Sequence, residues 1–277
     1  MGFLDMLGMK VKFGKYEKGF VGKEREIIDD VVKPIINLRN LVEFHCKSRE
    51  SSSLLGVLTK SQHEEFALQP KIQNWSDGLV LYSPIDALSE KFSIPNVLRT
   101  MRYCGISCFF GLASEVPIRG AIEMDWAVEI DDGDIFGRAV AASYKLESDV
   151  AGYPRIVIGK KLLELLERAR GLEPTNIYEE KNRDFADKCL KWIIPDLDGY
   201  YMVDYLQPGF FGPSAHDSYR ELLVSAYEFI QKEYSKHRSE DTKLAMRYSW
   251  LREYFVSRLP ALGVLLEPSV SLDNLLK

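Results

Sequence analysis

Residues 74–83 of the chain read Asn74-Trp75-Ser76-Asp77-Gly78-Leu79-Val80-Leu81-Tyr82-Ser83. An Asp-Gly pair between two strand-like runs is a strong β-hairpin signal, because the turn positions need a positive φ that these two residues tolerate. The run after the pair is apolar and strand-favouring, and the run before it, which includes Phe66, Leu68 and Ile72, partly alternates. We therefore predict a hairpin with Asp77 at its turn, a position that is by itself usually structural.

Strand-like and helix-like patterns alternate along the rest of the chain. Short apolar runs predict strands within 1–9, 117–124, 154–158 and 199–206, and residues 131–134 read as an acidic loop. Apolar residues at helical spacing predict helices over 27–46, 98–112, 138–150, 160–170, 179–192, 219–230 and 244–255. The sequence therefore predicts an α/β (α+β) layered fold in one domain over 1–277, with a core over 1–170 and a mostly helical elaboration over 171–277.

The composition is that of an ordinary globular protein. The chain has 277 residues, of which 46% are hydrophobic and 28% charged, and its net charge is −5. An acidic chain lacks the basic face that nucleic-acid backbone requires, and no run approaches the ~20 apolar residues that cross a bilayer. We therefore expect a cytoplasmic protein that binds neither nucleic acid nor a membrane.

Cysteine and histidine are sparse and scattered. The four cysteines have no CxxC spacing, and the four histidines have no HxH or HExxH spacing. We expect the cysteines to be reduced and mostly buried, and we expect no zinc site.

A single carboxylate, Asp5, interrupts the apolar run at residues 1–9. Burying an unpaired carboxylate is costly, so Asp5 must be exposed, paired with a cationic side chain, or bound to a metal ion.

Three segments follow one another in the order found in class III nucleotidyl cyclases. Phe3-Leu4-Asp5-Met6-Leu7-Gly8-Met9 is similar to the first strand of that family, F-x-D-I-x-G-F, and Asp77 matches its hairpin aspartate. Residues 134–147 match in part the later segment D-x-x-G-x-x-V-N-x-A-x-R-L-E. The variant residues at 118–122, 143–147 and 153–156 most resemble bacterial pyrimidine nucleotide cyclases of the Pycsar antiphage type. The resemblance spans about residues 1–159.

The resemblance implies a two-metal site for Mg²⁺ or Mn²⁺. Asp5 and Asp77 would be its carboxylate ligands, with the backbone carbonyl of Met6 as a further ligand. In-line attack of a ribose 3′-hydroxyl on the α-phosphate needs one ion to acidify the hydroxyl and a second to hold the triphosphate. The alternative is a strand-edge aspartate and a turn aspartate that never meet.

The resemblance also assigns the base-recognition positions. Adenylyl cyclases of the family use a lysine and an aspartate there, and this chain has Gln73 and Asp134. An amide paired with a carboxylate presents a different donor and acceptor set, which favours another base. The alternative for Asp134 is an ordinary acidic loop shared with Asp131 and Asp132.

Two transition-state positions depart from the family pattern. The asparagine that orients the ribose falls on Ala141, and the arginine that neutralises the α-phosphate falls on Lys145, which keeps the charge but loses the bidentate fork. Arg119, Arg138 and Arg155 are the candidate compensating cations, with Arg155 also a candidate for substrate binding.

The expected activity is conversion of UTP or CTP to the 3′,5′-cyclic monophosphate and pyrophosphate, as a signal in antiphage defence. The family builds its active site between two subunits, so the resemblance also implies a homodimer and a separate effector protein that binds the cyclic nucleotide. Two alternatives remain: a purine cyclase acting on ATP or GTP, and a catalytically inactive cyclase-like module that binds a nucleotide or a partner.

Overall fold

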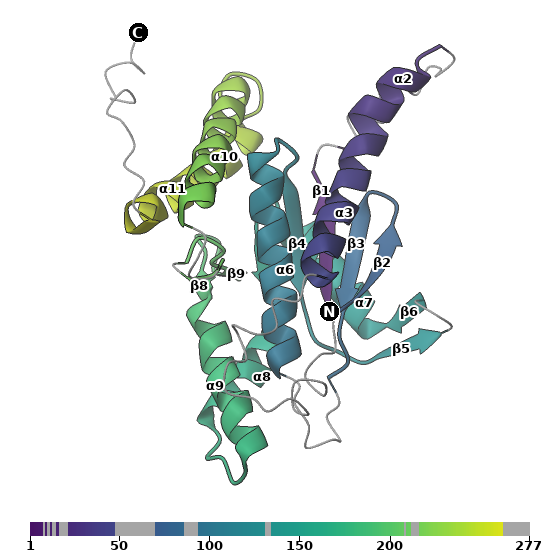
Figure 1. Cartoon of the computed structure of the whole chain (residues 1–277). Helices are drawn as coiled ribbons and strands as arrows, with labels where there is room; N and C mark the ends of the chain where they lie inside the picture. Colours follow the sequence, from purple (N-terminus) through teal and green to yellow (C-terminus); the bar gives the residue numbers. More distant parts are fainter. Residues whose placement is uncertain are drawn as a thin grey trace.

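The computed structural model gives a mixed α/β architecture, in which helices cover a mostly antiparallel sheet (Figure 1). It describes residues 1–7, 9, 12, 15–16, 22–47, 70–85, 94–130, 134–207, 209–211 and 216–262. Of the residues named above, Gly8, Phe66, Leu68, Asp131 and Asp132 lie outside the described ranges.

Within the described residues, seven strands form one sheet in the order β2-β3-β1-β4-β7-β9-β8. All neighbouring pairs are antiparallel except β4 and β7, which are parallel. The strands of this sheet are β1 (Gly2–Met6), β2 (Lys71–Trp75), β3 (Gly78–Tyr82), β4 (Ile118–Ile122), β7 (Ile156–Ile158), β8 (Ile193–Pro195) and β9 (Tyr201–Val203). A separate antiparallel hairpin is formed by β5 (Ala127–Ile130) and β6 (Asp134–Gly137).

The central helix α6 (Ile94–Ala113) lies across one face of the sheet (Figure 1). In the figure α10 and α11 lie near one end of α6, and α8 and α9 lie near its other end. Other helical segments within the described ranges are α2 (Glu24–Ile27), the π-helical η1 (Ile28–Val32), α3 (Lys33–Lys47), α7 (Arg138–Val150), α8 (Lys160–Gly171), α9 (Ile177–Lys191), α10 (His216–His237), α11 (Thr242–Arg258) and the 3₁₀ turn η2 (Leu259–Leu262).

The two faces of the sheet bury different side chains, because successive residues of a strand point to opposite faces. On β1, Leu4 and Met6 belong to the large core shared with α6, whereas Phe3 packs on the other face with Val140 of α7. Asp5 follows the alternation and shares the α7 face with Phe3. This face carries the candidate site.

The predicted hairpin is present, but its turn lies one residue earlier than the Asp-Gly pair indicates. The turn residues are Ser76 and Asp77, with Ser76 at φ 45°, and Gly78 is already the first residue of β3. A Cβ on Gly78 would lie 2.8 Å from the backbone oxygen of Leu4. The glycine is therefore required by the close approach of β1 to β3, and not by a positive φ.

The first predicted helix is divided, and part of its expected apolar face is exposed. Ile28 and Val32 are 47% and 38% exposed, while Val31 and Leu38 are buried. The π-helical turns of η1 change the number of residues per turn, so the apolar spacing loses its phase there. Pro34 lacks the N–H that a continuous α-helix would use at that point.

Two further features differ from the prediction. Asp134 begins strand β6 and is not in a loop, because it pairs with Ile130 of a β5 strand that the sequence did not reveal. After Gly171 the chain adds two strands to the central sheet: β9 lies within the strand predicted at 199–206, whereas β8 was not predicted.

The predicted helices over 98–112, 138–150 and 160–170 are confirmed as α6, α7 and α8. Cys104, Cys108 and Cys189 are buried, as expected, and the side chain of Cys46 lies outside the described residues. None of the described helices combines the length and the apolar character that crossing a membrane requires.

Candidate active site

Asp5 and Asp77 meet at one end of the sheet. Asp5 on β1 pairs in register with Gly78 on β3, and Asp77 is the turn residue immediately before that glycine. The pKa of Asp5 is raised, mainly by burial; the positive charge of Arg119 offsets part of the shift, and the negative charge of Asp77 adds to it. The hairpin therefore brings together the two carboxylates that the sequence singled out.

Arg119 on β4 lies directly opposite Asp5 and bridges three groups. Its Nη2 donates to Asp5 Oδ2 over 3.3 Å, and its Nη1 donates to the backbone oxygen of Ala151 over 3.3 Å. Its Nε lies 2.5 Å from Oε1 of Glu147, a charge contact without hydrogen-bond alignment. The guanidinium is thus fixed between β1 and the end of α7.

Glu147 is a site residue to which the sequence reasoning assigned no role. It is 1% exposed, and burial raises its pKa to about 7, with Arg119 opposing the shift and the charges of Asp5 and Asp77 adding to it. A signal was available, because Val140, Ser143 and Glu147 follow helical spacing on the buried face of α7. Like Asp5 in its strand, a carboxylate on an apolar helical face must be exposed, paired with a cationic side chain or bound to a metal ion.

The donors at this end of the sheet suit a magnesium or manganese ion. Mg²⁺ is usually held by one or two carboxylates, retained waters and substrate phosphates, and Asp5 and Asp77 supply two carboxylates. The side chain of Met6 is 2% exposed within the core, so only its carbonyl is suited to act as a ligand. Among the described residues, no group of three or more His, Cys, Asp or Glu side chains forms a metal cage. The two carboxylates, Asp5 and Asp77, suit an ion that takes its remaining ligands from water and phosphate.

Gln73 and Asp134 also meet, although 61 residues separate them in the sequence. Gln73 Nε2 donates to Asp134 Oδ1 over 3.2 Å, and the backbone N–H of Ile135 donates to Gln73 Oε1 over 3.4 Å. The β5–β6 hairpin positions Asp134 beside β2. The pair presents one amide and one carboxylate at the two positions expected for base recognition.

Helix α7 holds the predicted catalytic cations far apart. Lys145 and Ala141 are exposed on its outer surface. Arg138 starts the helix, with a side chain that is 69% exposed and an Nε 3.6 Å from Oδ2 of Asp125. The nine residues from Arg138 to Glu147 span about 13 Å along the axis, so Arg138 is remote from the carboxylate end.

Arg155 is enclosed by its own partners. It is 1% exposed, and its guanidinium pairs with Asp196 and Asp198 and stacks 4.7 Å from the ring centroid of Tyr153. These contacts hold the start of β7 to the loop between β8 and β9, and they leave the side chain little freedom to reach a substrate.

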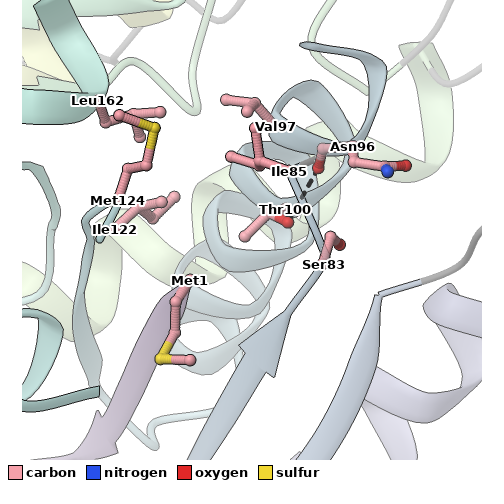
Figure 2. Close-up of a pocket in the computed structure, with 9 residues that line it drawn as sticks. All are labelled: Met1, Ser83, Ile85, Asn96, Val97, Thr100, Ile122, Met124 and Leu162. Atoms are coloured by element: carbon pink, nitrogen blue, oxygen red, sulfur yellow. Dashed lines mark hydrogen bonds between the residues drawn. The ribbon is translucent and has the colours of Figure 1, made fainter. Parts of the chain in front are cut away.

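Two pockets lie near Met1, at the end of β1 remote from Asp5. The smaller is enclosed by Met1, Thr100, Ile122 and neighbouring side chains (Figure 2), and its volume of ≈ 10 Å³ admits about one water molecule. The larger, of ≈ 810 Å³, includes Lys71 and Tyr82, which lie on the strands beside Gln73. Asp5 and Asp77 line neither pocket.

No family model matches the chain, and no curated protein and no solved structure matches it either.

Proposed function

We propose that the protein is a nucleotidyl cyclase that converts UTP or CTP to the 3′,5′-cyclic monophosphate and pyrophosphate. The observation that carries the proposal is the strand register that places Asp5 beside the Asp77 turn. Two carboxylates meeting at a sheet end, one of them in an otherwise apolar strand, are what a divalent cation and a triphosphate require.

The chain's own groups have distinct tasks in this reaction. Asp5 and Asp77 would hold Mg²⁺ or Mn²⁺, which would supply Lewis acidity to the reaction when bound. Arg119 lies beside Asp5 and offers positive charge where the phosphate chain enters. In the structure Asp5 is paired with Arg119, so this guanidinium lies beside the carboxylate that would hold the cation.

Gln73 and Asp134 support the choice of a pyrimidine. Together they offer an amide N–H donor and carboxylate and amide acceptors within one hydrogen-bonded unit. The N3–H of uracil and the N4 amine of cytosine are both donors that these acceptors match, so UTP and CTP remain equal candidates. The cyclic nucleotide would be read by a separate effector protein.

The homodimer forms part of this proposal. Lys145 is exposed on α7 and Asp5 lies on the inner side of that helix, so a substrate bound at Asp5 in one subunit meets a Lys145 supplied by another. Exposed aromatic residues Trp75, Phe136 and Tyr144, at 41%, 57% and 51%, offer apolar area for such an association.

Incubation of the purified protein with each of the four nucleoside triphosphates and Mn²⁺ tests the proposal directly. We expect a cyclic product from UTP or CTP. Product from ATP or GTP alone would support a purine cyclase, and no product from any of the four would rule out the enzymatic function under these conditions.

A second candidate is an inactive nucleotide-binding module. It is favoured by Ala141, which has no hydrogen-bonding side chain, and by Arg119, which already neutralises Asp5. This candidate requires triphosphate binding without turnover, and the same incubations combined with a binding measurement separate it from the enzyme.

A further inference from the structure

We propose that Arg247 of α11 binds the outer phosphates of the nucleotide held at Asp5 and Asp77. The inference rests on the proposed function and adds to it a residue from the C-terminal helices, about 90 positions beyond the segments that resemble the cyclase family. It adds a second guanidinium, besides that of Arg119, at a site where this chain has Lys145 in place of the arginine of the family pattern.

The packing of α11 places Arg247 beside the loop that follows α7. Trp250, one helical turn further along, contacts Tyr153 of that loop with ring centroids 6.1 Å apart. A Cβ built on Gly152 would lie 3.0–3.1 Å from three atoms of the Arg247 guanidinium. The guanidinium therefore lies against the backbone of Gly152, and a side chain at position 152 would crowd it.

Arg119 connects this loop to the carboxylate site. It donates to Asp5 with Nη2 and to the oxygen of Ala151, the residue before Gly152, with Nη1. The groups therefore run in the order Asp5, Arg119, Arg247 across the end of the sheet. A phosphate chain that starts at Asp5 and extends past Arg119 reaches Arg247 with its outer phosphates.

The charges around Arg247 favour an anion. Burial lowers its pKa, and the positive charge of Arg119 lowers it further, with Asp241 opposing. Arg119 pairs with Asp5 and Glu147, whereas Arg247 forms no ion pair or hydrogen bond within the part of the chain that the structure describes. A partly buried guanidinium beside another cation gains most from a ligand that brings negative charge.

The test is a binding measurement with a 3′-deoxynucleoside triphosphate, UTP or CTP type, which lacks the attacking hydroxyl and cannot be cyclised. Isothermal titration calorimetry of the full chain in the presence of Mn²⁺ gives the affinity for this triphosphate and for the corresponding 3′-deoxynucleoside monophosphate. We expect Arg247→Ala to weaken triphosphate binding by about tenfold or more and to change monophosphate binding little. Only the triphosphate carries the outer phosphates to which Arg247 would donate a charge-assisted hydrogen bond.

Arg252→Ala is the matched control, because Arg252 lies on the same helix and contacts the ring of Tyr234 at 4.8 Å. We expect it to change neither affinity. Arg247→Gln is a second variant, which keeps a side chain of similar length and some hydrogen-bond donors but removes the charge. Thermal unfolding shows that each variant is folded. We expect Arg247→Lys to recover part of the triphosphate affinity.

The outcomes separate the two proposals. A wild-type protein that binds and cyclises the triphosphate, with Arg247→Ala and Arg247→Gln binding the deoxy analogue equally well, would overturn the role of Arg247 alone. An equal loss for mono- and triphosphate would also overturn it, because that pattern indicates a structural role. A wild-type protein that binds no triphosphate would overturn both.

Discussion

Arg119 and Asp5 face each other directly on neighbouring antiparallel strands, and Nη2 of the arginine lies 3.3 Å from Oδ2 of the aspartate. The same guanidinium contacts Glu147, whose side chain is only 2% exposed. One cation is thus shared by two carboxylates from different elements. Its removal leaves one of those carboxylates buried without a counter-charge.

Arg119→Ala is therefore expected to destabilise the fold. Removing one partner of a buried ion pair costs about 3–5 kcal/mol, and the partial exposure of Arg119 places this variant near the lower end of that range. Denaturant unfolding measures the loss. The double variant Arg119→Ala/Glu147→Gln should recover most of the stability, because the buried charge is then absent; a double variant as unstable as the single one would contradict this account.

Glu147 should also make stability depend on pH. Burial raises its pKa from the usual 4.5 to about 7, so the folded protein binds this proton more tightly than the unfolded chain does. The stability that this group contributes is complete below about pH 4.5 and is lost as the pH rises to about 7. We expect Glu147→Gln to flatten this part of the stability profile, measured without divalent cations. Superimposable profiles for wild type and variant between these pH values would refute the assignment.

Asp5→Asn and Asp77→Asn are each expected to lower cyclase turnover by at least about 100-fold, because the amide keeps the shape but not the charge that holds a divalent cation. Neither should lower the melting temperature much; Asp5 in particular has an unfavourably raised pKa, so its charge is not stabilising at neutral pH. Asp187→Asn is the control, since Asp187 lies on the surface of α9 and pairs with Lys191. Equal losses in all three variants would indicate a non-specific effect.

The sequence predicted the elements that depend on local patterns, and it missed those that depend on contacts between distant segments. The range of α7 is as predicted, because helical periodicity and a preceding glycine are local signals. The strand β8 and the β5–β6 hairpin were missed, because their short runs become strands only through pairing with a neighbour.

The candidate site follows the same division. Asp5 and Gln73 could be identified from motif positions, and the structure brings Asp5 to the Asp77 turn and Gln73 to Asp134. Arg247 could not be identified from the sequence, because no pattern in α11 indicates that Gly152, more than 90 residues away, leaves room for a guanidinium. Charged residues on amphipathic helices are ordinarily solvated, so only packing distinguishes this one.

Gln73→Lys should shift base selectivity toward ATP. The substitution creates the lysine–aspartate pair that adenylyl cyclases of the family use, with Asp134 already within 3.2 Å of the amide. We expect the ratio of kcat/KM for ATP to that for the preferred pyrimidine triphosphate to rise about 10-fold or more, since mismatched hydrogen-bonding groups discriminate strongly. Asn74→Lys is the control, because Asn74 is the next residue on β2 and points to the opposite face. A similar shift in both variants would show that added positive charge, and not pairing with Asp134, is responsible.

A shared active site predicts that two inactive variants restore each other. Asp5→Asn damages the metal residues of its own subunit, and Lys145→Ala removes the exposed cation that we expect to act on the partner's substrate. In a two-fold dimer containing one copy of each, one site carries both changes and the other carries neither. Random exchange makes half of the dimers mixed, so we expect about a quarter of wild-type activity after the two proteins are mixed, compared with near zero for each alone. Light scattering gives the oligomeric state of the same samples. Phe136→Asp places a charge on an exposed aromatic position and should reduce both the fraction of dimer and the cyclase activity. A mixture that stays inactive while the subunits exchange would show that each active site is complete within one chain.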